Sequence, residues 1–305
     1  RLEEQPRCDT ALADALACDP DALGRLLDAC VSLGLLYKDG VHYANSPAAS
    51  VYLVHTSPSA ITGYVEYSQK ALWQLWAELP NAVREGTHRW EQVFGGKGGL
   101  FSHYYKTEED KRRFLMGMHA YGLISSPQIV KAFDLSGFQH LVDLGGATGH
   151  LPIAACQAYD GLRATVFDLP EVLHLAQEVV GQQGLEGRIA MAGGDFFADP
   201  LPKADLYSLG RILHDWTEQK IHRLLERIYQ TLPEGGAVLV AEKLIDESGT
   251  QPLWALLQSL NMLVVTEGKE RKLSEYRQLL ENAGFHGVEA IVLDKSPLDA
   301  IIAYK

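Results

Sequence analysis

The sequence predicts an α/β protein with a Rossmann-like, mostly parallel sheet, preceded by a smaller and mostly helical domain. From residue 139 onward, short apolar stretches typical of strands alternate with stretches typical of helices, which is the pattern of successive βαβ units. One of these strands, residues 141–144, runs directly into Gly145, Gly146 and Gly149. A strand, a glycine turn and a helix in this order open a nucleotide-binding unit.

The parallel part of the sheet is expected to be followed by an antiparallel hairpin at its edge. Parallel strands are predicted at residues 139–144, 163–167, 188–192, 205–210 and 236–242, with helices at 171–182, 218–231, 252–265 and 273–283. Two late strands, at about 287–293 and 299–304, are close in sequence and are joined through the turn Ser296-Pro297. Such a short connection predicts antiparallel pairing.

The first 60 residues read as two helices and a hairpin, the outline of a winged helix. Asp9 or Thr10 can cap a helix over residues 11–18, and Asp19-Pro20 ends it. Apolar residues at helical spacing predict a second helix over 21–33. Residues 35–37 and 41–43, joined by Lys38-Asp39-Gly40, predict the hairpin.

Between this unit and the sheet, residues 60–135 are expected to be helical and rich in aromatic side chains. Thr107 and Asp110 form a capping box at the start of a helix. We therefore predict two domains: residues 1–100, a winged-helix-like packing or dimerisation module, and residues 101–305, with linking helices at about 105–135.

Composition and charge exclude several classes of protein. The chain has 47% hydrophobic and 22% charged residues, and its net charge of −12 disfavours nucleic acid and anionic membranes as partners. Residues 1–100 carry 8 Lys/Arg and 12 Asp/Glu, whereas a DNA-binding winged helix normally presents a basic face. No apolar run reaches the roughly 20 residues that a membrane span needs.

The cysteines and the start of the chain add two expectations. Cys8, Cys18, Cys30 and Cys156 show no metal-ligand spacing, so we expect no metal site and reduced thiols in a cytoplasmic protein. The chain begins at Arg1 without an initiator Met, so an upstream segment is expected.

The glycine turn and a later acid predict a nucleoside site. The turn has the pattern D-x-G-G-x-x-G and not G-x-G-x-x-G, so it need not hold a pyrophosphate. The next strand ends at Asp168, about 20 residues on, where a carboxylate can accept from ribose hydroxyls. A ribose without a pyrophosphate predicts S-adenosylmethionine as cofactor. The alternative is a tight turn with an unrelated surface Asp.

Two further segments follow predicted strands and are expected at the same edge of the sheet. Asp195 could accept from an adenine amino group while Phe196 packs on the ring, although both could belong to an ordinary turn. His214 lies at a strand end, which suits a general base, although a capping or core His is the commoner explanation. Glu242 and Glu270 could orient that imidazole, or each could be a solvated charge.

The segments LVDLGGATG, TVFDLPEV, GGDFF, LGRILHDW, AEKLID and TEGKER occur in this order along the chain. Together they resemble the caffeate/hydroxyindole type of S-adenosylmethionine-dependent O-methyltransferase. SLNMLVVTEGKER and FFADPLP are most similar to its acetylserotonin branch. The resemblance covers nearly the whole chain, and it implies a class I methyltransferase sheet and an N-terminal dimerisation domain. It also implies a homodimer and S-adenosylhomocysteine as the product. We expect the reaction to be metal-independent, because the chain offers no clustered ligand spacing and the proposed base removes the proton itself.

The resemblance also implies roles for individual residues. Gly145 would flank the amino-acid end of the cofactor, Asp168 would hold the ribose, and His214 would be the base, oriented by Glu242 and Glu270. The remaining expected contacts are Tyr105, Gly194, Asp195, Phe196 and Arg211 for the cofactor, and Asp215, Asn261 and Val265 for the acceptor.

Two departures from the pattern concern the ligands. At Gly122 the hydroxyindole branch has a Trp near the cofactor, and at Val265 its melatonin-forming members carry a Gln. These departures leave the identity of the acceptor open. The expected class is a small aromatic hydroxyl, a phenol or a hydroxyindole such as N-acetylserotonin. The alternatives are a catalytically silent cofactor-binding scaffold and a DNA-binding regulator.

Overall fold

The computed structural model describes residues 1–95 and 107–305, and it divides into two compact units, Arg1–Glu66 and Tyr67–Lys305. The second unit begins before the expected domain limit at residue 100. The reason is that its first helices pack on a later one: the indole nitrogens of Trp76 and Trp90 donate to Asn261 Oδ1 and to the carbonyl of Val265. Where the functional domains divide stays a prediction.

The first unit contains the two predicted helices and the hairpin, plus one short strand and one short helix that were not predicted. In sequence order it consists of β1 (Arg7–Cys8), α1 (Asp9–Leu16), α2 (Pro20–Ser32), β2 (Leu36–Asp39), β3 (His42–Asn45), α3 (Pro47–Tyr52) and the start of α4 (Thr62–Tyr67). The strands form an antiparallel sheet in the order β1-β3-β2. The helices cover it with a small apolar core that includes Leu12, Leu27 and Tyr43.

The caps of the first two helices differ from each other. Asp19 caps α2 by accepting from the amide of Ala22 at 2.8 Å. Helix α1, in contrast, begins at Asp9, and its N-cap is Cys8, whose side chain makes no capping bond. The predicted Asp9 or Thr10 cap is therefore wrong, because both residues already lie in the first helical turn.

The second unit holds a seven-stranded sheet in the order β11-β12-β8-β7-β4-β5-β6. Its parallel strands are β4 (His140–Leu144), β5 (Arg163–Asp168), β6 (Ile189–Gly193), β7 (Leu206–Gly210) and β8 (Ala237–Glu242). The last two strands, β11 (His286–Ile291) and β12 (Asp299–Tyr304), form the expected antiparallel hairpin at the edge, with β12 antiparallel to β8. The predicted α/β class and mostly parallel sheet are confirmed.

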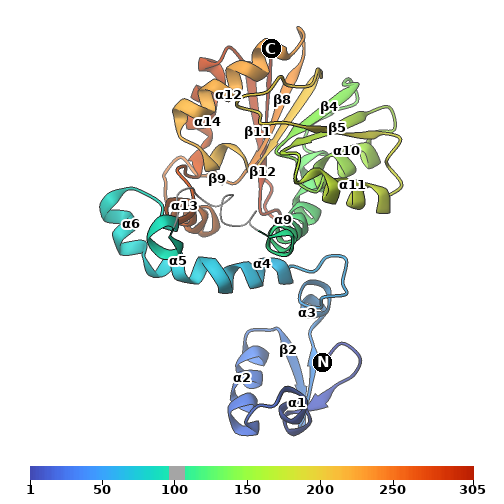
Figure 1. Ribbon diagram of the computed structural model, residues 1–305, viewed down its shortest axis with the longest axis vertical. Helices are drawn as coiled ribbons and strands as arrows, with labels where there is room; N and C mark the ends of the chain where they lie inside the picture. Colours follow the sequence, from blue (N-terminus) through green and yellow to red (C-terminus); the bar gives the residue numbers. More distant parts are fainter. Residues whose placement is uncertain (96–106) are drawn as a thin grey trace. The chain divides into compact units, whose positions relative to one another are not determined.

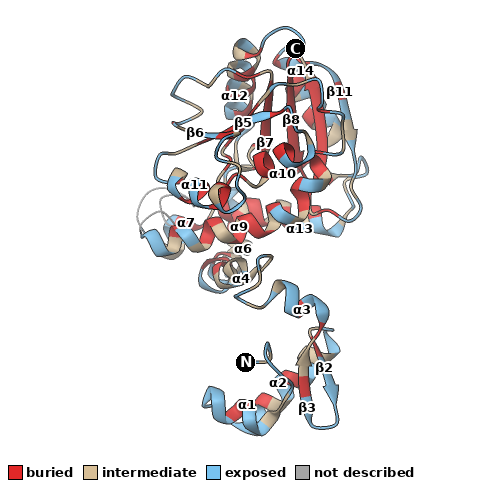
Figure 2. Ribbon diagram, turned by 90° about the vertical axis from the view of Figure 1, so that its right-hand side faces the viewer, coloured by how far each residue is buried: buried red, intermediate tan, exposed pale blue. Residues whose placement is uncertain are grey.

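Helices cover both faces of this sheet, as Figure 1 shows. Helices α10 (His150–Ala158) and α11 (Leu173–Gln182) pack on one face, and α12 (Glu218–Thr231) and α14 (Leu273–Asn282) on the other. Side chains of α12 and α14, among them Leu224, Leu225 and Leu280, join the strands in one large core. The central strands are buried, and the outer faces of the helices are exposed (Figure 2).

The remaining elements lie before the sheet or join its strands. They are η1 (Ser68–Leu72), α5 (Trp73–Ala77), α6 (Leu79–Glu85), α7 (Trp90–Phe94), α9 (Glu108–Ile129), η2 (Leu213–Asp215), β9 (Leu244–Ile245), α13 (Leu253–Val265) and β10 (Arg271–Lys272). Thr107 caps α9 as predicted: its hydroxyl accepts from the amide of Asp110 at 3.1 Å.

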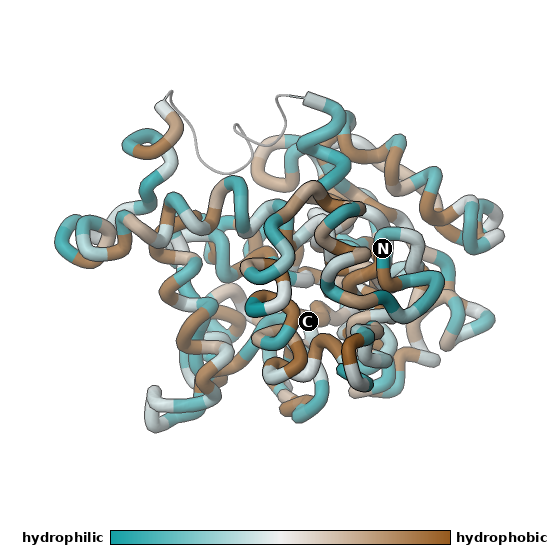
Figure 3. Tube along the Cα trace, turned by 90° about the horizontal axis from the view of Figure 1, so that it is seen from below, coloured by the Kyte–Doolittle hydropathy of each residue, from teal (hydrophilic) through white to brown (hydrophobic). Residues whose placement is uncertain are grey.

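Hydrophobic stretches along the chain are short and alternate with hydrophilic ones, as Figure 3 shows. Among residues 1–95 and 107–305, we find no helix with the length and apolar character that crossing a membrane requires.

Candidate active site

Five segments that follow parallel strands meet at the carboxyl edge of the sheet, the edge where α/β proteins bind ligands. They are the glycine turn after β4, Asp168 at the end of β5, the segment after β6, the segment 211–215 after β7, and Glu242 at the end of β8. Strand pairing fixes their neighbours. Asp168 is in register with Gly193, and Gly210 is in register with Ala241, which places Arg211 beside Glu242.

The glycine turn after β4 is closed tightly over the sheet. The amide of Gly145 donates to the carbonyl of Phe167 at 2.8 Å, and Gly145 has φ +68°, a backbone conformation that favours glycine. A Cβ on Gly145 would lie 2.4 Å from Ile212 Cδ1, and a Cβ on Gly146 would lie 2.8 Å from Asp143 Oδ2. The backbone of the turn can therefore come closer to a ligand than a turn with side chains could.

Asp168 is half-buried beside this turn, and both of its carboxylate oxygens are held by backbone amides. Oδ2 accepts from Ala147 at 2.8 Å, and Oδ1 accepts from Leu169 at 2.7 Å. Burial raises the pKa of Asp168 to about 6, although the two amide hydrogen bonds lower it. Each oxygen keeps a further lone pair, so a fixed and largely ionised carboxylate is available to hydroxyl donors at neutral pH.

The segment after β6 adds small and aromatic residues next to Asp168. The amide of Gly194 donates to the carbonyl of Asp168 at 3.0 Å, and a Cβ on Gly194 would lie 2.7 Å from the ring of Phe167. Asp195 is exposed, and its Oδ1 accepts from the amide of Phe197 at 2.8 Å. Phe196 is half-buried, and its ring lies 3.6 Å from the Cβ position of Gly145. These residues suit a nucleoside, with a carboxylate for the ribose and an apolar face for the base.

His214 is the centre of a buried cluster formed by η2, β8 and the segment before β10. Its Nδ1 lies 2.7 Å from Glu270 Oε1 and 3.3 Å from Glu242 Oε2, and its Nε2 lies 3.7 Å from Asp215 Oδ1. The side chains of His214, Glu242 and Glu270 are at most 4% exposed. Arg271 is in register with Leu244 in the pair β9–β10, which brings Glu270 next to the end of β8.

The carboxylates around His214 determine its charge state. Burial on its own lowers the pKa of this imidazole, but the charges of Glu242, Glu270 and Asp215 outweigh it and raise the pKa to about 9. For Glu242 the two effects are reversed: burial raises the pKa of its carboxyl group, and the charge of His214 lowers it. Oε2 of each glutamate accepts no hydrogen bond within the described residues, so the imidazolium is the partner that compensates their burial.

Glu242 also fixes the backbone that carries the histidine. Its Oε1 accepts from the amides of Ile212 and Leu213, both at 2.9 Å, and from the amide of His214 at 3.4 Å. The sequence predicted Glu242 as a support for the ring but gave no sign of these amide contacts. Three donors on one oxygen hold the η2 turn in a single position relative to β8.

Two residues of the TEGKER segment, Gly268 and Arg271, support His214 and were not predicted as site residues. A Cβ on Gly268 would lie 2.2 Å from the carbonyl oxygen of His214, so only glycine fits there. The buried guanidinium of Arg271 donates to the carbonyls of Leu213 and Trp216 on either side of His214, both at 3.2 Å. In the sequence, Gly268 and Arg271 are marked only by the glycine among charged residues in TEGKER. That pattern does not reveal a contact with a segment more than 50 residues away.

Of the residues predicted to bind the acceptor, only some lie next to His214. Asp215 lies beside its Nε2, whereas Asn261 and Val265 belong to the buried face of α13. Asn261 Oδ1 already accepts from the indole of Trp76 at 2.9 Å. Their role in acceptor binding therefore stays a prediction. Tyr105, predicted to contact the cofactor, lies outside the described residues.

Arg211 is half-buried at the end of β7, on the side of the cluster that faces the glycine turn. Its φ is +58°, a left-handed conformation that is rare for a residue with a side chain and that is often found at functional sites. The backbone amide donates to the carbonyl of Ala241 at 3.0 Å, and the guanidinium carbon lies 5.3 Å from the ring centroid of Tyr121. The place beside the cofactor that the resemblance implies for Arg211 stays a prediction.

A metal ion is one further possibility at the histidine cluster, since ligand atoms of His214, Glu242 and Glu270 all lie within 4.8 Å of one another. However, Nδ1 is engaged with Glu270, and Glu242 Oε1 accepts three amides. These bonds suit an imidazole that carries its proton on Nδ1, and a metal on that nitrogen would have to displace the proton.

Comparisons with known proteins identify the family. Residues 76–286 match the O-methyltransferase domain, and residues 2–55 match the O-methyltransferase dimerisation domain. The chain belongs to the S-adenosylmethionine-dependent O-methyltransferase family. It is 42% identical to bovine acetylserotonin O-methyltransferase, and this match covers 93% of the chain and 84% of the bovine protein.

Two further proteins are similar to this O-methyltransferase. It is 42% identical to a human probable bifunctional dTTP/UTP pyrophosphatase/methyltransferase protein over 96% of its own length, and it spans about half (47%) of that protein. The crystal structure of human N-acetylserotonin methyltransferase in complex with SAM has a TM-score of 0.92 with 38% identity, and it covers 99% of this chain and 88% of the human one. The predicted methyltransferase fold is thereby confirmed.

Proposed function

We propose that this O-methyltransferase methylates the hydroxyl of a small aromatic acceptor, a phenol or a hydroxyindole such as N-acetylserotonin, with His214 as the general base. The relatives named above support the acceptor class. The observation that carries the mechanism is the buried imidazole of His214. Its Nδ1 is held by Glu270 at 2.7 Å, while its Nε2 lies 3.7 Å from Asp215 Oδ1 and forms no hydrogen bond with any of the described residues.

The carboxylates make His214 a base that is suited to a phenol. A phenol has a pKa of about 10 and an ordinary imidazole about 6.5, so proton transfer between them is uphill by roughly 5 kcal/mol. With the pKa of His214 raised to about 9, the cost falls to about 1.4 kcal/mol. The same shift keeps most of the imidazole protonated at neutral pH, so the rate should rise as the pH approaches 9.

The residues at the carboxyl edge fit the cofactor. Asp168 would hold the ribose, Gly194 and Phe196 would contact the adenosine, and the turn at Gly145 would approach the amino-acid end. When bound, S-adenosylmethionine supplies an electrophilic methyl group. The protein positions the acceptor oxygen, removes its proton at Nε2 of His214, and stabilises the resulting imidazolium with Glu242 and Glu270.

We further propose that the enzyme works without a metal, as a cytoplasmic homodimer. The match of residues 2–55 to a dimerisation domain supports the dimer. All four cysteines are free, which is typical of a reducing compartment. A catalytically silent scaffold is disfavoured, because the base and both of its supports are in contact.

A panel of phenols and hydroxyindoles, incubated with methyl-labelled S-adenosylmethionine and examined by mass spectrometry, tests the acceptor class. We expect label on an aromatic hydroxyl and none on matched compounds whose hydroxyl is replaced by hydrogen. Cofactor binding without transfer to any member of the panel would contradict the proposal and favour the silent scaffold.

A further inference from the structure

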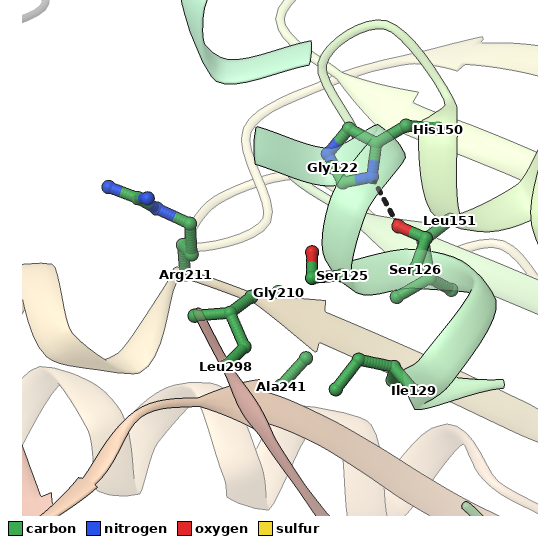
Figure 4. A pocket seen from close by; sticks show the side chains of 10 residues that line it. All are labelled: Gly122, Ser125, Ser126, Ile129, His150, Leu151, Gly210, Arg211, Ala241 and Leu298. Carbon is green, nitrogen blue, oxygen red and sulfur yellow. Dashed lines mark hydrogen bonds between the residues drawn. The ribbon is translucent and has the colours of Figure 1, made fainter. Parts of the chain in front are cut away.

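A small cavity of about 20 Å³ lies between α9, α10 and the ends of β7 and β8, beside the glycine turn (Figure 4). Ser125, Ser126, His150 and Arg211 give it a polar side, and none of the ten described residues that line it is acidic. This volume holds about one water molecule or one oxygen of a ligand. Its donors and its positive charge suit an anionic oxygen.

The ring of His150 occupies this side of the cavity only because residue 122 is glycine. A Cβ on Gly122 would lie 2.1 Å from Cγ of His150 and 2.4 Å from its Nδ1. Any other residue at 122 must therefore move the imidazole. Gly122 and His150 form a matched pair: the first leaves a space on α9, and the second fills it from the start of α10.

The imidazole of His150 is held in one orientation by α9. Its Nδ1 lies 2.8 Å from Oγ of Ser126, a side chain that is only 2% exposed. Figure 4 shows the second ring nitrogen on the side away from Ser126. Burial, with smaller contributions from His119 and Arg211, lowers the pKa of His150 to about 3, so the ring is neutral. When the Ser126 hydroxyl donates to Nδ1, Nε2 carries the proton, and it has no hydrogen-bond partner among the described residues.

We propose that His150 binds the cofactor: its Nε2–H, together with the Arg211 guanidinium, receives the α-carboxylate at the amino-acid end. This inference rests on the proposed function, because it takes S-adenosylmethionine as the ligand. His150 directly follows Gly149, so the turn that approaches the ligand and the imidazole that would receive its carboxylate lie on the same short segment. The other explanation is that His150 only holds α10 against α9.

Calorimetry with two ligands separates these explanations. S-adenosylhomocysteine has the α-carboxylate, whereas 5′-methylthioadenosine lacks the whole amino-acid end. A hydrogen bond to a charged group contributes enough that His150→Ala should weaken S-adenosylhomocysteine about tenfold or more. The same substitution should change the affinity for 5′-methylthioadenosine less than twofold. Equal weakening of both ligands, or no weakening of either, would overturn the proposal.

Variants at His150 and at His119 separate hydrogen bonding from packing. His150→Gln keeps a donor of similar reach and should retain most of the affinity, whereas His150→Leu, which is of similar size but has no donor, should lose it as His150→Ala does. His119→Ala removes the neighbouring buried ring, which lies 6.3 Å from that of His150 and does not line the cavity, so it should not discriminate between the ligands. If it discriminates as strongly as His150→Ala, the effect is one of packing.

The matched pair is tested by a double-mutant cycle. Gly122→Ala should displace the imidazole and weaken S-adenosylhomocysteine to a similar degree as His150→Ala. The double variant should be no weaker than His150→Ala alone, since the displaced group is already absent. If the losses of affinity in the two single variants add up in the double variant, Gly122 and His150 do not act as a pair. Methyl transfer is not measured in these experiments, so a failure of the acceptor screen leaves the test intact, whereas a parent protein that binds neither ligand would overturn both proposals.

Discussion

The two halves of the candidate site use carboxylates in opposite ways. At the nucleoside end, Asp168 is half-buried and each of its oxygens is fixed by one backbone amide. At the base end, Glu242 and Glu270 are almost fully buried, and their partner is a side chain that can gain or lose a proton. Burial raises the pKa of Asp168 to about 6, whereas the paired glutamates raise that of His214 to about 9. The first arrangement suits a static acceptor, and the second suits the proposed base.

The largest effect is expected at the base itself. His214→Ala should fold and bind cofactor, but its turnover on a phenolic acceptor should fall by about 10²–10⁴-fold, the usual range for a lost general base. The deficit should shrink at high pH, where more phenolate forms without help. His222→Ala, on the exposed part of α12, is the matched control and should be near parental. Near-parental turnover of His214→Ala at neutral pH would reduce this histidine to a structural residue.

The next effect is expected where the backbone supports the base. In Gly268→Ala, the new Cβ would lie 2.2 Å from the carbonyl oxygen of His214, so the η2 turn must shift. Misplacement by about 1 Å can cost on the order of 10²-fold in rate. We expect the loss in kcat, with an unchanged affinity for S-adenosylhomocysteine. Gly161→Ala, where a Cβ meets no atom within 4 Å, is the control. Parental kcat in Gly268→Ala would show that the turn does not constrain the base.

The next effect is expected at Asp168, in the affinity for S-adenosylhomocysteine and in how that affinity depends on pH. Asp168→Ala should weaken S-adenosylhomocysteine by about 1.5–3 kcal/mol, or roughly 10–100-fold. Because the raised pKa of Asp168 lies at about 6, the carboxylate gains a proton as the pH falls through 6, and the parent should lose affinity there. Calorimetry between pH 5 and pH 8 measures both. Unchanged affinity in a folded Asp168→Ala protein would remove this residue from the site.

The smallest effect is expected from chelation. The bonds of His214 Nδ1 and Glu242 Oε1 favour a proton over a metal ion, so excess chelator should leave the turnover unchanged. If chelator abolishes turnover and a divalent cation restores it, the cluster of His214, Glu242 and Glu270 is a metal site and the proton-transfer mechanism is wrong.

Much of this architecture could be predicted from local patterns, because periodicity and glycine turns reflect interactions between near neighbours. The helix at 218–231 and the strand at 299–304 were predicted with the bounds that α12 and β12 have. Contacts between distant segments left no such pattern. Nothing near Gly268 shows that it packs on His214, and nothing near Asn261 shows that its oxygen is taken by Trp76. Because parallel strands end at the same edge of a sheet, the sequence predicted His214 and Glu242 at one edge. Only the structure shows that the amides of Leu213 and His214 donate to Glu242 Oε1.

The pH–rate profile of Glu270→Gln tests most directly whether the carboxylates tune the base. In the parent, kcat/KM should rise with pH to an inflection near 9, because the neutral imidazole is the active form. Removing one of the charges that raise this pKa should move the inflection to lower pH and lower the plateau, since the imidazole becomes a weaker base. Glu242→Gln should shift it in the same direction. A Glu270→Gln profile with the parental inflection, or one moved to higher pH, would contradict the account.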